Sequence, residues 1–173
     1  RHIDSVLFSS KKFLFENFEN PFDFQDLYKF NRAASWIEIK EGRYESAQKM
    51  LENVIKEETD SIEYLSALQD LAICYLLTEQ YDKFSKTAKQ SLYISDNLPT
   101  KDNNYFFKVT SKKLKAYLYI FSDNNIPKGI KTLEDLEQEL RKNDMMQRYR
   151  CSVLDDLSNL YLDNDQPDKY IQT

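Results

Sequence analysis

The stretch KEGRYESAQKMLENVI, residues 40–55, decides which fold this chain is expected to adopt. Gly42 interrupts a helical pattern, Tyr44 follows two positions later, and an amphipathic run then begins with Ala47 in its first turn. Glycine is favoured where a helix ends, and a small residue lets two helices cross closely. The stretch therefore predicts the turn of a helical hairpin.

The same pattern recurs along the chain, in LLTEQYDKFSKTA, FSDNNIPKGIKTL and LDNDQPDKYIQT. Each junction has a polar turn followed by one residue that opens the second helix, namely Tyr44, Tyr81, Ile126 and Pro167. The successive spacings are 37, 45 and 41 residues. A recurrence within roughly 20–50 residues is typical of solenoids built from stacked units.

Helical periodicity predicts about nine helices and no strand, which makes the expected fold an all-α solenoid of stacked helix-turn-helix hairpins. We expect helices near 5–18, 24–40, 44–56, 61–78, 81–95, 102–122, 127–142 and 145–162, and one from Pro167. The chain is interpreted as a single domain, 1–173, with a leading helix in 1–22. The repeat units are 23–59, 60–98, 101–143 and 144–173. The chain begins at Arg1 without methionine and ends inside the last unit, so a fragment of a longer protein is expected.

Composition narrows the function. The 173 residues include only two glycines and carry a net charge of −5, which disfavours glycine-rich phosphate loops and a main nucleic-acid surface. Cys74 and Cys151 stand apart from any metal-spaced motif, as expected for reduced cysteines of a cytoplasmic protein. No apolar run is long enough for a membrane span and no secretory signal is present, so no membrane partner is expected.

Catalytic chemistry is not expected either. His2 is the single histidine, so no histidine-based nucleophile or metal constellation is available. Asp155 and Asp156 are adjacent, and neighbouring helical positions point about 100° apart, so they do not converge on one atom. We therefore predict no enzyme, no cofactor and no metal site.

The junctions and their flanking helices resemble the tetratricopeptide repeat, whose period is about 34 residues. In that family small residues occupy the helix crossings and an aromatic residue fills the turn. The residues that match these roles here are Ala34, Ser35, Tyr44, Ala47 and Leu51, then Leu71, Ala72, Tyr75, Tyr81 and Ala88, then Ala116, Ile120, Ile126, Gly129 and Leu133, and finally Leu157, Ser158 and Tyr161. Phe84 and Tyr117 depart from the pattern at normally small positions.

The resemblance also implies which residues line the concave face and bind a short peptide or protein segment. These residues are Lys29, Arg32, Trp36, Ile39, Gln69, Asp70, Ile73, Leu114, Lys115, Leu118, Phe121, Asp155 and Asn159, and Lys40, Leu76, Leu77 and Leu162 extend the same face. The alternative is that these side chains only pack against neighbouring helices or a partner protomer.

The glycine-poor, divergent repeats are similar to the sensor domain of Gram-positive peptide-pheromone regulators of the Rgg, PlcR and PrgX types. That similarity implies peptide sensing in the groove for quorum sensing and transcription regulation, homodimerisation, and DNA binding only through a separate N-terminal domain that lies outside this sequence. Two alternatives stay open: a protein-interaction scaffold without a small ligand, and a fragment of a Rap-type phosphatase regulator.

Overall fold

The computed structural model describes residues 24–57, 62–97, 105–142 and 147–164, and for 24–30, 57, 105 and 106 it describes the backbone alone. Within these ranges every regular element is a helix: α2 (Phe24–Lys40), α3 (Tyr44–Glu57), α4 (Ile62–Leu77), α5 (Tyr81–Asn97), α6 (Tyr105–Phe121), α7 (Ile126–Arg141) and α8 (Gln147–Asp163). The all-α prediction is confirmed for this part of the chain. Seven helices are described against about nine expected, and the expected helices at 5–18 and from Pro167 lie outside the described residues.

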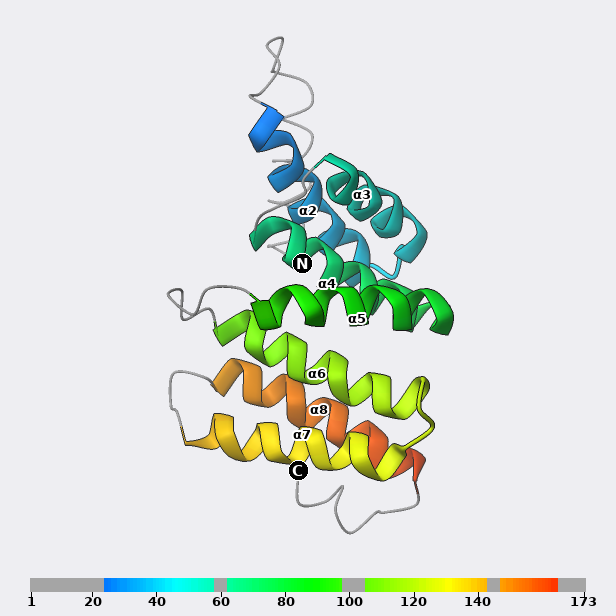
Figure 1. Cartoon of the computed structure of the whole chain (residues 1–173), viewed down its shortest axis with the longest axis vertical. Coiled ribbons are helices and arrows are strands. Elements are labelled where there is room, and N and C mark those ends of the chain that lie inside the picture. The colour runs from blue at the N-terminus through cyan, green and yellow to red at the C-terminus, as the bar shows by residue number, and fades with distance from the viewer. Residues whose placement is uncertain (1–23, 58–61, 98–104, 143–146, 165–173) are drawn as a thin grey trace.

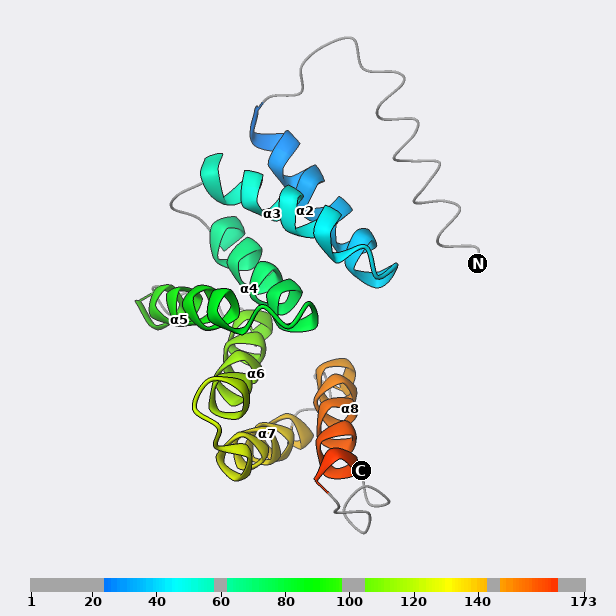
Figure 2. The ribbon, with the colours of Figure 1, turned by 90° about the vertical axis from the view of Figure 1, so that its right-hand side faces the viewer.

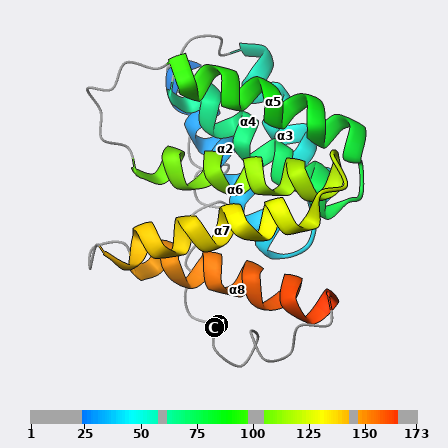
Figure 3. The ribbon, with the colours of Figure 1, turned by 60° about the horizontal axis from the view of Figure 1, so that its bottom comes forward.

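The helices form a stack of hairpins, α2–α3, α4–α5 and α6–α7, followed by α8 (Figure 1). Figure 2 shows that the stack curves, with α2, α4, α6 and α8 bordering the inside of the curve and α5 and α7 on its outside. We call α2, α4, α6 and α8 the inner helices. In Figure 3 the helices α5 to α8 follow one another side by side, each in contact with the next.

The turns between the paired helices share a residue in the left-handed conformation. Gly42, Glu79 and Asn124 have φ values of 74°, 58° and 49°, and each lies two residues before the next helix begins. In the first two turns the residue after this position donates its N–H to a carbonyl five residues back, at 2.8 Å from both Arg43 and Gln80. These bonds are the long closing bonds of a helix C-cap with a left-handed residue. The repeat predicted from the sequence is thus present in the backbone.

The third turn is one residue longer. Three residues separate α2 from α3 and α4 from α5, whereas Ser122 to Asn125 separate α6 from α7. Its closing bond accordingly spans six residues, from the N–H of Asn125 to the carbonyl of Tyr119 at 2.7 Å. The side chain of Asn125 also caps α7, accepting from the N–H of Lys128 at 3.2 Å.

Two buried clusters form the core. The first joins α3, α4, α5 and α6 around Leu51, Phe84 and Leu114, and the second joins α6, α7 and α8 around Leu133 and Leu157. Because α6 contributes to both clusters, only one narrow strip of that helix is left for the inside of the curve. This strip decides which α6 residues can take part in binding.

Candidate functional site

The inner helices are linked by polar contacts made from one repeated position. This position lies eight residues before the end of α2, α4 and α6 and is occupied by Arg32, Gln69 and Lys113. Each places a nitrogen donor against the next inner helix, in the pairs Arg32–Asp70 at 3.5 Å, Gln69–Ser111 at 3.1 Å and Lys113–Asp156 at 2.7 Å. These contacts tie the four inner helices together along the inside of the curve.

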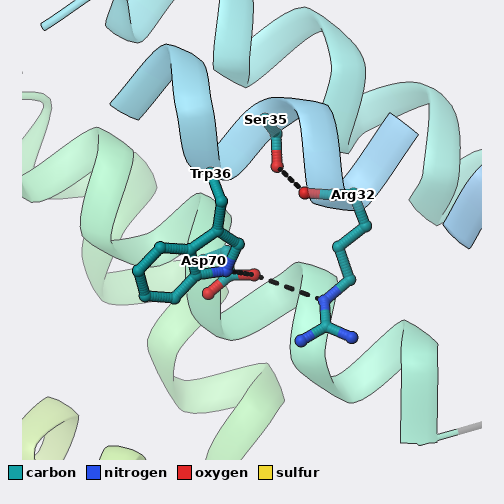
Figure 4. Close-up of polar contacts among 4 residues, drawn as sticks. All are labelled: Arg32, Ser35, Trp36 and Asp70. Carbon is teal, nitrogen blue, oxygen red and sulfur yellow. Dashed lines mark hydrogen bonds and ion pairs between the residues drawn. The ribbon is translucent and has the colours of Figure 1, made fainter. Parts of the chain in front are cut away.

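The contact between α2 and α4 centres on Asp70, which is 6% exposed (Figure 4). Trp36 donates from Nε1 to Asp70 Oδ2 at 3.0 Å, and the same oxygen lies 3.5 Å from Nε of Arg32. Figure 4 shows the two terminal guanidinium nitrogens of Arg32 directed away from the carboxylate. Asp70 therefore holds both side chains of α2 while leaving part of the guanidinium available.

Burial sets the protonation of this carboxyl group. Desolvation raises the pKa of Asp70 from 3.8 to about 6, against the opposing effects of the Arg32 charge and of the hydrogen bonds from Trp36 and Arg32. The single contact to Arg32 is too long to offset the loss of water around the carboxylate.

The contact between α4 and α6 is fully buried. Gln69 donates from Nε2 to Ser111 Oγ, and Ser111 Oγ in turn lies 3.0 Å from Ser95 Oγ of α5. Gln69 has no exposed surface. Its predicted placement on the binding face is therefore wrong, because the amide is used to join two helices across their interface.

The contact between α6 and α8 is a half-buried ionic cluster. Lys113 Nζ lies 2.7 Å from Asp156 Oδ2 and 2.8 Å from Ser152 Oγ. Burial, and then the neighbouring charge of Asp156 and a hydrogen bond to it, raise the pKa of Tyr117 well above its usual value. The sequence interpretation included neither Lys113 nor Tyr117 in the binding face.

An apolar row runs beside this polar row, one helical turn closer to the hairpin turns. Four residues before the end of α2, α4 and α6 stand Trp36, Ile73 and Tyr117. Trp36 is 41% exposed, and Ile73 and Tyr117 are partly buried against the first core cluster. The inner helices thus carry a row of donors, of which Gln69 is buried between α4 and α6, beside a row of large apolar side chains.

Three of the α6 residues predicted from the sequence lie outside these two rows. Leu114 and Leu118 are buried in the first core cluster. Lys115 is exposed, but it lies between Lys112, which pairs with Glu139 of α7, and Tyr119, whose ring lies under Lys128 of α7. Residues three and four apart share one side of a helix, so Lys115 lies on the side of α6 that faces α7, and its role in the groove stays a prediction.

The remaining predicted residues divide as follows. Asp155 and Asn159 are exposed on α8, next to the residues that contact Lys113. Ile39 packs partly against the first core cluster, and Phe121 stacks on Tyr81 at the end of α6. The side chain of Lys29 lies outside the described residues.

Among the residues that the structure describes, no group of histidine, cysteine and carboxylate side chains is arranged to hold a metal ion. No helix in the same ranges is long and apolar enough to cross a membrane.

Residues 38–97 match the family model of the tetratricopeptide repeat. They comprise the end of α2 with α3, α4 and α5, and include both turns that share the three-residue geometry. No curated protein and no solved structure matches the chain. The tetratricopeptide repeat is generally a non-catalytic interaction fold. The match therefore shows that residues 38–97 are similar to the tetratricopeptide repeat, a fold that typically binds protein partners.

Proposed function

We propose that the inner face of α2, α4, α6 and α8 binds an extended peptide or protein segment, with Trp36 as its main anchor. The observation that carries this proposal is the state of the indole ring. It is 41% exposed, yet its Nε1 is fixed by the bond to Asp70. A large aromatic side chain that is held in place but uncovered is an effective contact for a partner.

The fixed ring lowers the cost of binding. A side chain that is ordered only on association costs about 0.5–1.5 kcal/mol, and Trp36 is already ordered by its hydrogen bond. Ile73 and Tyr117 offer further apolar surface on the two following helices, and Arg32 offers guanidinium N–H groups to a partner's carboxylate or carbonyl oxygens. Such a mixture suits an extended segment with alternating apolar and polar groups.

The finer proposal is that the ligand is a short signalling peptide and that the chain is the sensor and dimerisation part of a bacterial transcription regulator. It is supported by the resemblance to peptide-pheromone regulators and by the interlocked inner helices. A peptide that binds one curvature of the stack better than another shifts the population toward that curvature. A change of curvature would alter the distances between neighbouring inner helices, and the polar contacts Arg32–Asp70 and Lys113–Asp156 join such helices.

The test uses the fluorescence of Trp36, which is the single tryptophan of the chain. Short hydrophobic peptides are titrated while the emission is followed, and affinities are measured by calorimetry. We expect Trp36→Ala to weaken binding by about tenfold or more, since loss of a central aromatic contact commonly costs at least that much. Asn159→Ala should weaken it less.

Tyr93→Ala is the matched control, because Tyr93 is an aromatic residue of α5 that is 73% exposed. It should leave the affinity unchanged. Equal affinities for wild type, Trp36→Ala and Asn159→Ala would remove the inner face as the binding site. The sensor proposal adds that peptide changes the sedimentation or scattering profile of the protein, and a profile that peptide leaves unchanged would contradict it.

A further inference from the structure

A second apolar surface lies on the edge formed by the hairpin turns. Figure 1 shows the turns α2–α3, α4–α5 and α6–α7 along the right-hand side of the molecule. Leu77 ends α4, Tyr81 begins α5 and Phe121 ends α6, and these side chains are 49%, 41% and 41% exposed. The rings of Tyr81 and Phe121 are stacked, with centroids 5.5 Å apart and an angle of 7° between their planes. We call these three residues the edge patch.

The edge patch is preformed. Stacking fixes the two rings against each other, and the ring of Tyr117 lies 6.4 Å from that of Phe121 at a tilt of 54°. Leu77 and Tyr81 are separated only by the three-residue turn, whose backbone is closed by a 2.8 Å hydrogen bond. Large apolar side chains left exposed side by side on a rigid surface mark a contact for a partner.

Charge around the patch indicates what that partner carries. Glu79 lies between Leu77 and Tyr81 in the turn, Asp82 follows Tyr81, and Asp123 follows Phe121 by two residues. All three carboxylates are exposed, and none of them forms an ion pair within the described part of the chain. The nearby cation of Lys83 is engaged elsewhere: it donates to Gln80 Oε1 at 2.8 Å and lies 5.3 Å from the centroid of the Tyr75 ring.

We infer that the edge patch docks a protein segment in which apolar or aromatic side chains are flanked by lysine or arginine. The apolar side chains cover the Tyr81–Phe121 stack, and the basic side chains meet the carboxylates of Glu79, Asp82 and Asp123. This surface does not include Trp36, and it borders the inner face at Tyr117, whose ring lies beside that of Phe121. Complementary charge contributes association rate and selectivity, while the aromatic stack supplies most of the affinity.

The test measures binding of a fluorescein-labelled peptide composed of phenylalanine, leucine and lysine by fluorescence anisotropy, beside a peptide of the same order with glutamate in place of lysine. Wild-type protein should bind the lysine peptide and not the glutamate peptide. Phe121→Ala should weaken binding by about tenfold. The double variant D82N/D123N should weaken it less and flatten its dependence on salt.

Tyr93→Ala serves as the control and should leave the affinity of the lysine peptide unchanged. Leu77→Ser provides a second variant of the patch should Phe121→Ala fail to fold, which circular dichroism will reveal. Binding that is lost in Trp36→Ala but kept in Phe121→Ala would place the peptide on the inner face and overturn the inference. Equal binding of the two peptides, or self-association of the protein that Phe121→Ala abolishes, would overturn it as well.

Discussion

The second and third hairpins place opposite residues at the same position of the repeat. Phe84 in α5 and Gly129 in α7 are each the fourth residue of their helix, as Ala47 is in α3. Phe84 is fully buried in the first core cluster. At Gly129, an added Cβ would overlap Cγ1 of Ile120 and lie 2.9 Å from the carbonyl oxygen of Ala116.

The difference shows that the size of the residue at the helix crossing is matched by the side chains packed around it. In the third hairpin the absent side chain lets Ile120 and the α6 backbone fill the space, while in the second a phenyl ring fills it. A repeat can therefore keep its architecture while this position ranges from the smallest residue to one of the largest. Substitutions at these positions measure how much the stability of each hairpin depends on the residue that it carries.

The largest effect is expected from Phe84→Ala. Removing a fully buried phenyl ring costs about 3–5 kcal/mol when the surroundings do not close over the cavity. Urea unfolding followed by circular dichroism measures this loss. A cost near 1 kcal/mol would mean that α5 moves in toward α4, and that the second hairpin is able to adopt the close crossing of the first.

The next effect concerns the buried acid of the second hairpin. The folded-state pKa of Asp70 is raised to about 6 from 3.8, so the folded protein favours the protonated carboxyl group. The stability that this group contributes is therefore fully present below about pH 4 and is lost as the pH rises through about 6. Replacement by asparagine keeps an acceptor for Trp36 and removes the buried charge. Relative to wild type, Asp70→Asn should therefore gain up to about 3 kcal/mol between pH 4 and pH 7.

Asp156→Asn supplies the matched variant at the α6–α8 contact, where the carboxylate is 20% exposed and pairs with Lys113. Whereas Asp70→Asn should be more stable than wild type at pH 7, Asp156→Asn should be less stable by about 1 kcal/mol, because its ion pair with Lys113 is broken. Unfolding curves measured at both pH values give the comparison. If Asp70→Asn has the same pH dependence as wild type, burial does not control this carboxyl group.

Gly129→Ala tests the close crossing in the third hairpin. Overpacking costs about 1–3 kcal/mol, and the gain in helix propensity offsets about 1 kcal/mol of that. The double variant G129A/I120A removes the nearest side-chain clash, so its loss should be smaller than the sum of the two single losses. Additive losses in thermal unfolding would show that Ile120 moves aside without cost.

The turns were predictable from sequence because their signals are local. Gly42 and Tyr44 mark the first turn, and the same pattern located the turns before Tyr81 and Ile126. Helix boundaries followed within a few residues. Trp36 and Asp70 were also assigned to the binding region from the repeat, and the structure brings them into contact.

The inner face of α6 was not predictable in the same way. Counting back from Ile126 assigns Leu118 to the position of Trp36 and Ile73, but the third turn has one extra residue. One residue rotates the selected face by about 100°, which exchanges Tyr117 for Leu118 and Lys113 for Leu114. Alignment by helix ends restores the register, and helix ends are the least certain feature of a sequence-based assignment.

The smallest effect is expected at the turns themselves. Glu79 and Asn124 occupy the left-handed conformation at φ 58° and 49°, where glycine carries no steric penalty. Glu79→Gly should stabilise the protein by about 0.5–1 kcal/mol, because a side chain with a Cβ is disfavoured there. Asn124→Gly should stabilise the protein less, since asparagine tolerates this conformation better than most residues.

Gly42→Ala, at φ 74° with open space around the added methyl group, isolates the backbone penalty and should cost about 1 kcal/mol. Equal gains at Glu79 and Asn124 in thermal unfolding would mean that the longer third turn is as strained as the second, whereas a gain confined to Glu79 would show that asparagine already relieves the strain in the third.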